Sequence, residues 1–442
     1  MELILILSQI IILLAVFSLG YPIVSNQNKN SFNSTNFLNH LILNIVIQIN
    51  IILLLTFINM SLEMITKIYF LYLFVMFILI AYKNILWFYL HRNLYYAFFI
   101  IFFFLSVDIA HSLTLDWDGQ IVWFYKTLNF YNEGTIKNLT NLPLGDGYSY
   151  PYLGSLIWAF FWKISFITEE YSGRLVYAFL YIIALFSLSE KLKVNFISKI
   201  VFSLFLLLLS YKYIFFGGSQ DILIFCFISF LAFYVHDIFL NKIKKLNKIN
   251  LLLIPLIFNC LIWTKDEGVV YSFILLFILT FFSKIKLNQK MFLISSTILL
   301  FLIRIFVYKF HNLDITINSC CYDYSPENIF SNIFSEKTFL FLKHFIFFGF
   351  LKNYFFIFGI IFLIISFYRR GYNKKTIYIY LFYLFSFGFL FIAHIAFKDN
   401  IDLSYMLKVN MHRLVFALSP FFILIFVEYY NSLKIKYNSN QI

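Results

Sequence analysis

The chain has 442 residues, of which 62% are hydrophobic and 12% are charged, and its net charge is +13. Soluble domains are close to half apolar and a quarter charged, so this composition excludes an ordinary soluble protein and indicates an integral membrane protein. The sequence shows no interleaved basic and aromatic surface of the kind that binds nucleic acid, so we expect no nucleic-acid partner.

The apolar segments predict an all-α, polytopic membrane fold. A hydrocarbon core of about 30 Å needs roughly 17–25 apolar residues per helix, and on that basis the chain has about thirteen transmembrane helices. The N-terminal segment lacks a basic region and a small-residue cleavage site, so we interpret it as the first span and not as a signal peptide. In chain order the predicted spans are residues 3–24, 37–59, 64–82, 93–110, 173–189, 199–216, 221–240, 249–263, 268–283, 291–309, 352–368, 376–397 and 413–430.

The basic residues predict which connectors share a side of the membrane, because lysine and arginine collect on the cytoplasmic side. All the basic connectors can lie there only if residues 151–167 do not cross. We therefore expect residues 119–132 and 151–167 to be interfacial helices in a large outer loop, 111–172. The loops 310–338 and 398–412 then face outward too. The basic connectors are residues 83–92, 191–199, 242–248, 284–290 and 369–375, together with the C-terminal tail.

The longest polar stretch, residues 115–152, opens with Asp116 and Asp118 in the sequence D-W-D-G. Acids at a membrane boundary are costly to desolvate, which makes them candidates for chemistry. The pair has two chemical interpretations: it shares a divalent cation, or one carboxylate is a general base that the other orients. The alternative is a solvated pair of acids beside a helix N-cap.

Lys126 follows Asp118 by eight residues, about two helical turns, so the two side chains can share one face of a helix. This lysine either binds a phosphate or extends to the interface as a snorkelling side chain. Trp123 is most simply an interfacial anchor, with stacking on a carbohydrate as the second possibility.

Asp221 begins a predicted span after the sequence G-G-S-Q. An acid so close to hydrocarbon needs a cationic partner, and Lys212 and Arg174 are the candidates; contact with the helix N-terminus is the alternative. Lys265 and Glu267, in the turn W-T-K-D-E-G, either line a site or belong to a solvated turn.

His412 and Arg413 begin the last predicted span. Arg413 either pairs with a lipid phosphate or snorkels at the boundary. We interpret Arg304, near the end of the span 291–309, as a snorkelling residue as well.

Taken in order, these motifs resemble the GT-C superfamily, which are integral-membrane glycosyltransferases that use lipid-phosphate-linked sugars. That family has an acidic motif in the first long outer loop of its catalytic module. In its bacterial branch, a helix with a tryptophan and a lysine follows, and then a Tyr-Pro pair. The matching residues here are Asp116-Trp117-Asp118, Trp123, Lys126 and Tyr150-Pro151.

Three later elements extend the resemblance, which covers about residues 93–290, under half of the chain. Glu170 to Arg174 is similar to the family's E-x-x-x-R element. Gly218 to Asp221 is similar to its Gly-x-x-Asp at a helix start, and Lys265 to Gly268 to its Lys-x-Glu-Gly turn.

The resemblance implies a catalytic membrane module over residues 93–309, preceded by accessory helices in 1–92 and followed by C-terminal helices in 310–442. It implies transfer of a sugar from a polyprenyl-phosphate donor to a glycan, lipid or protein acceptor, with inversion, at the outer face of a bacterial inner membrane. Family members differ in their need for a divalent cation, so a Mg²⁺ or Mn²⁺ ion on Asp116 and Asp118 stays open.

In this interpretation Asp118 or Asp116 is the catalytic base. The leaving phosphate lies near Lys126 or Arg413. The predicted substrate-binding residues are Lys126, Trp123, Tyr150, Arg174, Asp221, Lys265, Glu267, His412 and Arg413.

Two other functions compete with this one. A transporter or flippase would often show internal repeats and ionisable groups at mid-membrane; the sequence shows no such repeat. A glycan polymerase or ligase acting on diphosphate-linked precursors would instead depend on cationic residues such as His412 and Arg413.

Overall fold

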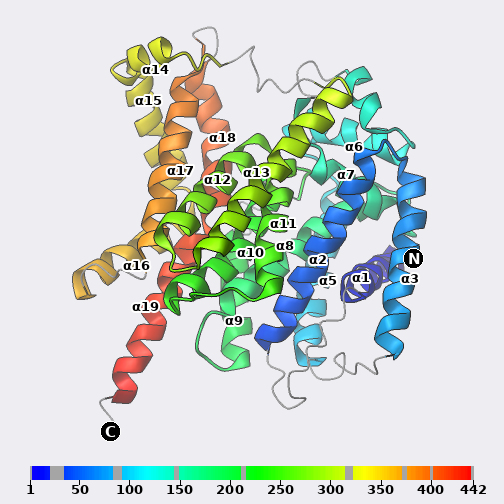
Figure 1. Ribbon diagram of the computed structural model, residues 1–442, viewed down its shortest axis with the longest axis horizontal. Helices are drawn as coiled ribbons and strands as arrows, with labels where there is room; N and C mark the ends of the chain where they lie inside the picture. Colours follow the sequence, from blue (N-terminus) through cyan, green and yellow to red (C-terminus); the bar gives the residue numbers. More distant parts are fainter. Residues whose placement is uncertain are drawn as a thin grey trace.

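The computed structural model describes residues 2–19, 34–82, 92–143, 149–210, 216–313, 322–370, 376–398 and 402–439. Within these ranges the regular structure is helical, and a single isolated β-bridge joins Tyr322 to Phe397. The predicted all-α class is therefore confirmed for the described part of the chain. Figure 1 shows the helices packed side by side, with α8 (Tyr171–Ser189) and α10 (Asp221–Leu240) near the centre.

The other helices surround this central pair. Those before it are α1 (Glu2–Ser18), α2 (Ser34–Phe57), α3 (Leu62–Tyr82), α5 (Arg92–Ser112), the π-helix η1 (Gly119–Trp123), α6 (Phe124–Tyr131), the 3₁₀-helix η2 (Ile136–Asn141) and α7 (Leu153–Lys163). Those between or after it are α9 (Phe196–Ser210), α11 (Lys248–Thr264), α12 (Asp266–Phe282), α13 (Leu287–Phe310), α14 (Pro326–Ile333), α15 (Glu336–His344), the π-helix η4 (Phe345–Phe350), α16 (Tyr354–Arg370), α17 (Ile377–Ile395), α18 (Leu403–Leu418) and α19 (Pro420–Ser439).

The protein is an integral membrane protein, but the predicted number of spans is wrong. Six described helices are long and apolar enough to cross a membrane, or eight if each of two bent helix pairs is one span; the sequence predicted about thirteen. Four of the other predicted segments contain apolar helical stretches of only 10–17 residues, which lie in α1, α5, α9 and α11. At 1.5 Å per residue these are shorter than a core of about 30 Å, and apolar composition alone does not separate a crossing from a buried helix.

The C-terminal part also differs from the sequence prediction. Residues 398–412 were expected to form a loop, but α18 begins at Leu403, where the Asp402 side chain accepts a hydrogen bond from the Tyr405 amide. The helix continues to Leu418 and meets α19 at a bend of 44°. Arg413 consequently lies inside a helix and not at the start of a span.

The basic connectors 191–199, 242–248 and 284–290 lie at the end of the bundle that is opposite Asp221. The Lys191 ammonium pairs with Asp237 near the C-terminal end of α10 at 2.7 Å. The Lys286 amide donates to the Lys244 carbonyl at 2.9 Å, which brings the connectors 242–248 and 284–290 together. Since Asp237 follows Asp221 by 16 residues on α10, about 24 Å separates the Lys191–Asp237 pair from Asp221.

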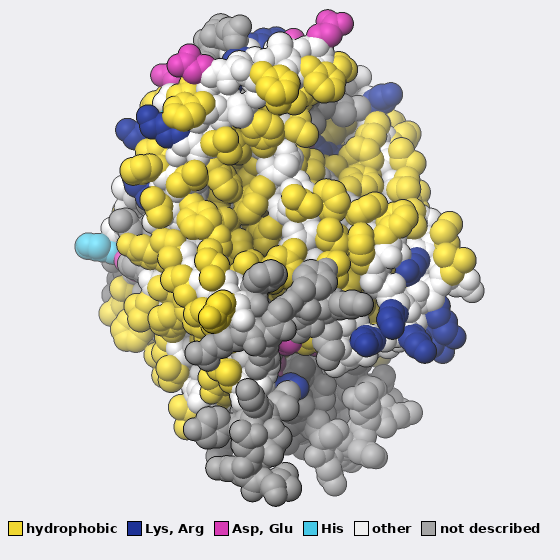
Figure 2. Space-filling model, turned by 90° about the vertical axis from the view of Figure 1, so that its left-hand side faces the viewer, with side chains coloured by type: hydrophobic (Ala, Val, Ile, Leu, Met, Phe, Trp, Pro, Cys, Tyr) yellow, Lys and Arg dark blue, Asp and Glu magenta, His cyan; other side chains and the backbone are white. Residues whose placement is uncertain are grey.

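Between the two ends the surface is apolar. Figure 2 shows hydrophobic side chains over most of one face, with charged side chains at its upper rim and a basic group at its lower right. Phe281 and Phe306 are exposed on α12 and α13 by 71% and 66%. Such exposure is unfavourable in water and is what contact with lipid chains requires.

Buried amides join the N-terminal helices to the rest of the bundle. Asn50 on α2 donates to the Leu256 carbonyl on α11 at 3.2 Å and accepts from the Asn259 amide at 2.7 Å. Gln9 on α1 donates to the carbonyls of Phe161 and Ser172. In a membrane protein such interhelical hydrogen bonds fix the register of packed helices. The accessory helices are thus packed on the predicted catalytic module.

Close packing of α7 on α8 depends on Gly173, and this dependence can be measured. A Cβ atom at Gly173 would lie 2.2 Å from the Trp158 carbonyl oxygen, whereas one at Gly388 on α17 would meet nothing within 4 Å. Alanine is favoured over glycine in helices by about 1 kcal/mol, but overpacking costs roughly 1–3 kcal/mol. We expect Gly173→Ala to lower the thermal midpoint in detergent and Gly388→Ala to leave it unchanged or raise it. Equal effects would contradict this packing.

Candidate functional site

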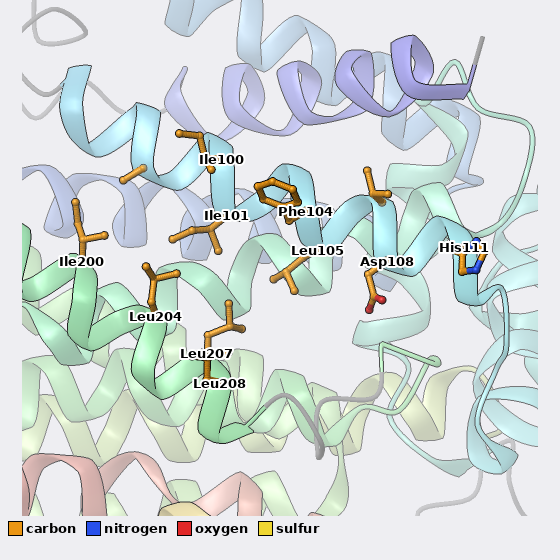
Figure 3. A pocket seen from close by; sticks show the side chains of 12 residues that line it. Ile100, Ile101, Phe104, Leu105, Asp108, His111, Ile200, Leu204, Leu207 and Leu208 are labelled. Carbon is orange, nitrogen blue, oxygen red and sulfur yellow. The ribbon is translucent and has the colours of Figure 1, made fainter.

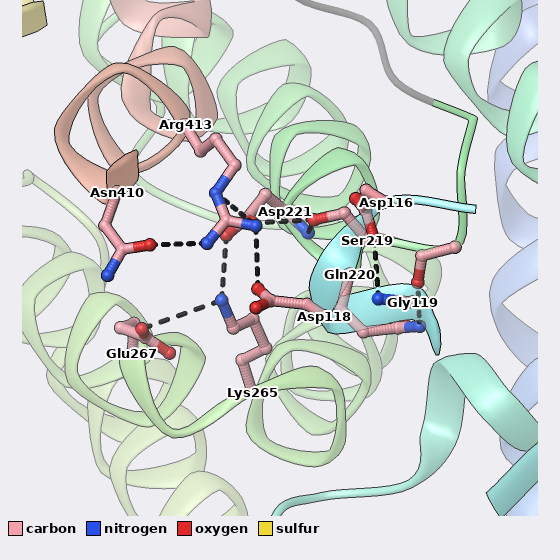
Figure 4. Close-up of polar contacts among 11 residues, drawn as sticks. Asp116, Asp118, Gly119, Ser219, Gln220, Asp221, Lys265, Glu267, Asn410 and Arg413 are labelled. Atoms are coloured by element: carbon pink, nitrogen blue, oxygen red, sulfur yellow. Dashed lines mark hydrogen bonds and ion pairs between the residues drawn. The ribbon is translucent and has the colours of Figure 1, made fainter. Parts of the chain in front are cut away.

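Six charged side chains from separate parts of the sequence lie together at the end of the bundle away from the basic connectors (Figure 4). Two acids precede η1, one opens α10, a lysine and a glutamate flank the start of α12, and an arginine belongs to α18. We call this group the charged cluster; its members are Asp116, Asp118, Asp221, Lys265, Glu267 and Arg413.

Arg174 supports the loops that carry the charged cluster. It is 1% exposed and holds Glu170 through two hydrogen bonds of 2.9 and 2.7 Å. Its Nη1 donates to the Phe216 carbonyl at 2.8 Å and to the Thr114 carbonyl at 3.3 Å. One buried guanidinium therefore connects the segment before Asp116 with the segment before α10.

Two glycines let these segments approach each other. The Asp116 amide donates to the Gly217 carbonyl at 2.9 Å, and a Cβ atom on Gly217 would lie 2.7 Å from the Asp116 nitrogen. Gly218 has a φ of +94°, which other residues rarely adopt. The sequence G-G-S-Q-D thus turns sharply into α10 and presents Asp221 to the charged cluster.

Arg413 and Lys265 neutralise the acids of the cluster. Arg413 Nη1 lies 2.7 Å from Asp118 Oδ2, and its Nε lies 3.8 Å from Asp221 Oδ2. Lys265 Nζ lies 2.9 Å from Asp221 Oδ1 and 3.7 Å from Glu267 Oε1. Burial by itself lowers the pKa of Lys265, but Asp221 and Glu267 outweigh burial and raise it, so the ammonium stays charged.

Asp116 differs from the other acids because no cation lies within ion-pair distance of it among the described residues. Its Oδ1 accepts a hydrogen bond from the Gly119 amide, as an N-cap side chain does. Burial raises the pKa of Asp116 to about 6, although the Gly119 hydrogen bond lowers it; the neighbouring Asp118 adds to the rise. A carboxylate with this pKa is ionised at neutral pH and basic enough to accept a proton.

The partners of Asp221 correct the sequence prediction. Arg174 pairs with Glu170 instead, and Lys212 lies outside the described residues. Asp221 is paired with Lys265, from a turn 44 residues away. Arg304 is also not a snorkelling residue, because it is 6% exposed and pairs with Asp266.

Lys126, Trp123 and Tyr150 lie together and contact one another. Lys126 is fully buried, donates to the Tyr150 carbonyl, and lies 5.5 and 6.0 Å from the ring centres of Trp123 and Tyr150. Burial lowers the pKa of Lys126 to about 7, so it is only partly charged at neutral pH. These contacts favour a role in positioning the segment at Tyr150 over one in holding a phosphate.

His412 and Arg174 also stand apart from the ion pairs of the cluster. His412 is half-buried next to Arg413 on α18. Arg174 is behind the loops and occupied by Glu170 and two carbonyl groups. Asp118, Asp221, Lys265, Glu267 and Arg413 are the predicted site residues that the structure joins directly by ion pairs.

Two contributors to the site were missed from the sequence. Asn410 Oδ1 accepts from Arg413 Nη2 at 2.6 Å, and the Ser219 hydroxyl donates to Asp221 Oδ2 at 2.8 Å. Asn410 precedes Arg413 by three residues, a spacing that makes them neighbours on a helix. That signal was hidden because residues 398–412 were expected to be a loop.

The predicted metal site on Asp116 and Asp118 lacks a matching ligand group. Among the described residues, no three His, Cys, Asp or Glu side chains are grouped so that they could hold a metal ion. Arg413 instead occupies the Asp118 carboxylate at 2.7 Å.

Comparison with known proteins leaves the family open, since no protein-family model, no curated protein and no solved structure matches the chain.

The pKa of Asp116 has a measurable effect on stability. Since its folded value of about 6 is above the ordinary 3.8, its contribution to stability is fully present below pH 3.8 and is lost as the pH rises through 6. Asp116→Asn keeps an oxygen for the Gly119 amide but does not titrate. We expect the thermal midpoint of this variant, relative to the unchanged protein, to rise from pH 4 to pH 7 and then level off. A difference that is independent of pH would contradict the raised pKa.

Proposed function

We propose that this protein is a membrane glycosyltransferase of the GT-C type, which moves a sugar from a polyprenyl-phosphate donor to an acceptor hydroxyl with inversion. The observation that supports this proposal is the charged cluster. It contains a carboxylate with a pKa of about 6, Asp116, and in the same cluster a guanidinium, Arg413, and an ammonium, Lys265. Displacement at an anomeric carbon with a phosphate leaving group needs such a base and such cations.

In the proposed reaction, Asp116 takes the proton from the acceptor hydroxyl. The acceptor oxygen attacks the anomeric carbon and forms the new glycosidic bond. The bond from that carbon to the phosphate oxygen breaks, and its electron pair leaves with the polyprenyl phosphate. The proton stays on Asp116 until it is released to water, and the sugar configuration is inverted.

The cations would stabilise the leaving phosphate. Arg413 is held by Asp118 and Asn410 but its Nε, which is buried, has no hydrogen-bond partner among the described residues. A guanidinium binds phosphate oxygens through several N–H groups in one plane, which suits it for this step. Lys265, paired with Asp221 at 2.9 Å, adds a second positive charge. With Arg413 in this position, no step of the proposal uses a metal ion.

The two paired acids would act by orientation. Asp118 forms an ion pair with Nη1 of the Arg413 guanidinium, and Asp221 forms ion pairs with both Arg413 and Lys265. Both acids are engaged, whereas Asp116 is free of cations within ion-pair distance among the described residues. We therefore assign the role of base to Asp116 and not to Asp118.

The location of the cluster supports a transferase over a transporter. Asp116 follows the end of α5, and Asp221 is the first residue of α10, so both lie at helix ends and not at the middle of a span. The lysine-rich connectors lie at the other end of α10. If these connectors are cytoplasmic, as positive charge predicts, the site faces outward from a bacterial inner membrane.

The role of Asp116 can be tested by measuring whether a sugar is lost from the envelope glycans or glycolipids of mutant strains. We expect a deletion strain and an Asp116→Asn strain to lack the same sugar mass in envelope glycans or glycolipids by mass spectrometry. With the purified enzyme, Asp116→Asn should lower turnover by about 10²–10⁴-fold, the range of general-base catalysis. The rate of the unchanged enzyme should fall below pH 6, where Asp116 is protonated.

The matched control is Asp402→Asn, because asparagine also caps a helix N-terminus well. This variant should keep full transfer. If Asp116→Asn transfers as well as Asp402→Asn at equal protein levels, Asp116 is not the base. If the deletion strain alone loses the sugar, another group is catalytic.

Arg413 should act on the donor phosphate. We expect Arg413→Gln to lower kcat/KM for the polyprenyl-phosphate donor by about 10²-fold or more, since removing one group that stabilises a developing negative charge costs 10²–10³-fold. Lys408→Gln, which removes an exposed charge from the same helix, should have no such effect.

The double variant Asp118→Asn with Arg413→Gln distinguishes a structural role of the ion pair from a role of Arg413 in catalysis. This variant removes both partners, so it should restore the thermal midpoint without restoring donor turnover. Recovery of turnover in the double variant would show that Arg413 only balances Asp118.

A further inference from the structure

A groove of about 810 Å³ runs between α5 and α9 (Figure 3), and none of its lining residues belongs to the charged cluster. Its walls are apolar side chains, such as Ile100 and Leu105 from α5 and Leu204 and Leu207 from α9. Apolar side chains also extend outward from the groove, since Phe104 on α5 is 67% exposed. The groove is therefore open toward the lipid and suited to a hydrocarbon chain.

The groove is long enough for a lipid chain. Its lining on α5 extends from Ala97 to His111, which is about 21 Å at 1.5 Å per residue. Half of a hydrocarbon core of about 30 Å is about 15 Å. A chain that enters at one boundary can therefore lie along the groove through a whole leaflet.

Asp108 and His111 form the polar end of the groove. They are three residues apart on α5, so they share one face of the helix, and Figure 3 shows both near its C-terminal end. Neither side chain has a hydrogen-bond or ion-pair partner among the described residues. Both side chains are exposed, so a ligand that lies in the groove can hydrogen-bond to them.

The polar end of the groove leads to the proposed base. Asp116 follows the last residue of α5, Ser112, by four residues, and its amide is bonded to Gly217, in the segment that follows α9. The cations are elsewhere: α5 packs on α8, α8 on α10, and α10 on α18, which carries Arg413. Arg413 thus comes from a helix that is separated from α5 by α8 and α10 in this series of contacts.

We propose that the α5–α9 groove binds the chain of the acceptor, a lipid with an uncharged, hydroxyl-bearing headgroup. This inference rests on the proposed function and names its acceptor class. A hydroxyl donates a hydrogen bond to Asp108 and can then be presented to Asp116. Among the described residues the groove lining contains no lysine or arginine, so a phosphate headgroup would meet the Asp108 carboxylate with His111 as the neighbouring titratable group.

Two photo-crosslinkable lipids with the same acyl chains test the inference, because they differ only in the headgroup. Diacylglycerol has a free hydroxyl, and phosphatidic acid has a phosphate in its place. The full-length protein is reconstituted in phosphatidylcholine nanodiscs with each probe, and labelled peptides are identified by mass spectrometry. We expect at least fivefold more labelling of α5 and α9 peptides by diacylglycerol than by phosphatidic acid.

The variants Leu204→Trp and Ile100→Trp fill the groove from either wall. Each should lower diacylglycerol labelling at least fivefold. Ile298→Trp is the control, because Ile298 is 41% exposed on α13, and it should leave labelling unchanged. The two filling variants are on different helices, so the test remains valid if one of them misfolds. The thermal midpoint of each variant is measured to detect misfolding.

The outcomes separate the inference from the proposed function, since binding is measured without turnover. Equal labelling by both probes would show a groove that takes bulk lipid without selection and would overturn the inference. Stronger labelling by phosphatidic acid would overturn it in favour of an anionic lipid. Asp116→Asn should keep the diacylglycerol labelling; if it does while transfer is absent from every strain, the proposed function fails and the lipid site stands.

Discussion

The site depends on the buried guanidinium of Arg174. Its N–H groups make four hydrogen bonds, to one carboxylate and two carbonyl groups, and so they join α8 to the loops before Asp116 and before α10. A buried charge is tolerated only when it is fully hydrogen-bonded, and removing its partner leaves a cost of several kcal/mol. That cost penalises any movement of Thr114 or Phe216 away from α8. The position of Asp116 relative to Asp221 follows from this constraint.

The ion pairs give the acids of the charged cluster different properties. The cluster contains four carboxylates and two cations, and both cations pair with Asp221 in addition to one other acid each. Asp116 is left without a cation within ion-pair distance among the described residues, and burial then raises its pKa to about 6. Two acids separated by a single residue thus acquire different properties. Asp118 orients Arg413, whereas Asp116 can accept a proton.

Much of the site could be predicted from the sequence because its acids and bases lie at the ends of apolar segments. Asp118, Asp221 and Lys265 were selected for that reason, and they do lie together. Their pairing could not be predicted, since Lys265 meets Asp221 only through the packing of α10 on α11. The prediction of the number of spans was wrong for a related reason. A helix surrounded by other helices, such as α11, is as apolar as one that contacts lipid, so composition does not distinguish them.

The arrangement of α8 and α10 also provides two different binding regions for two lipid substrates in the proposed reaction. Cations that suit a phosphate lie toward α18, while the apolar groove and the unpaired Asp108 lie toward α5 and α9. Asp116 lies in the segment between these regions, within the influence of both Arg413 and Asp221. A base so placed would meet the acceptor hydroxyl on one side and the anomeric carbon on the other, with the leaving phosphate pointing away. The proposed displacement with inversion requires this in-line order, and the separation of charged and apolar regions across the α8–α10 pair supports the proposal.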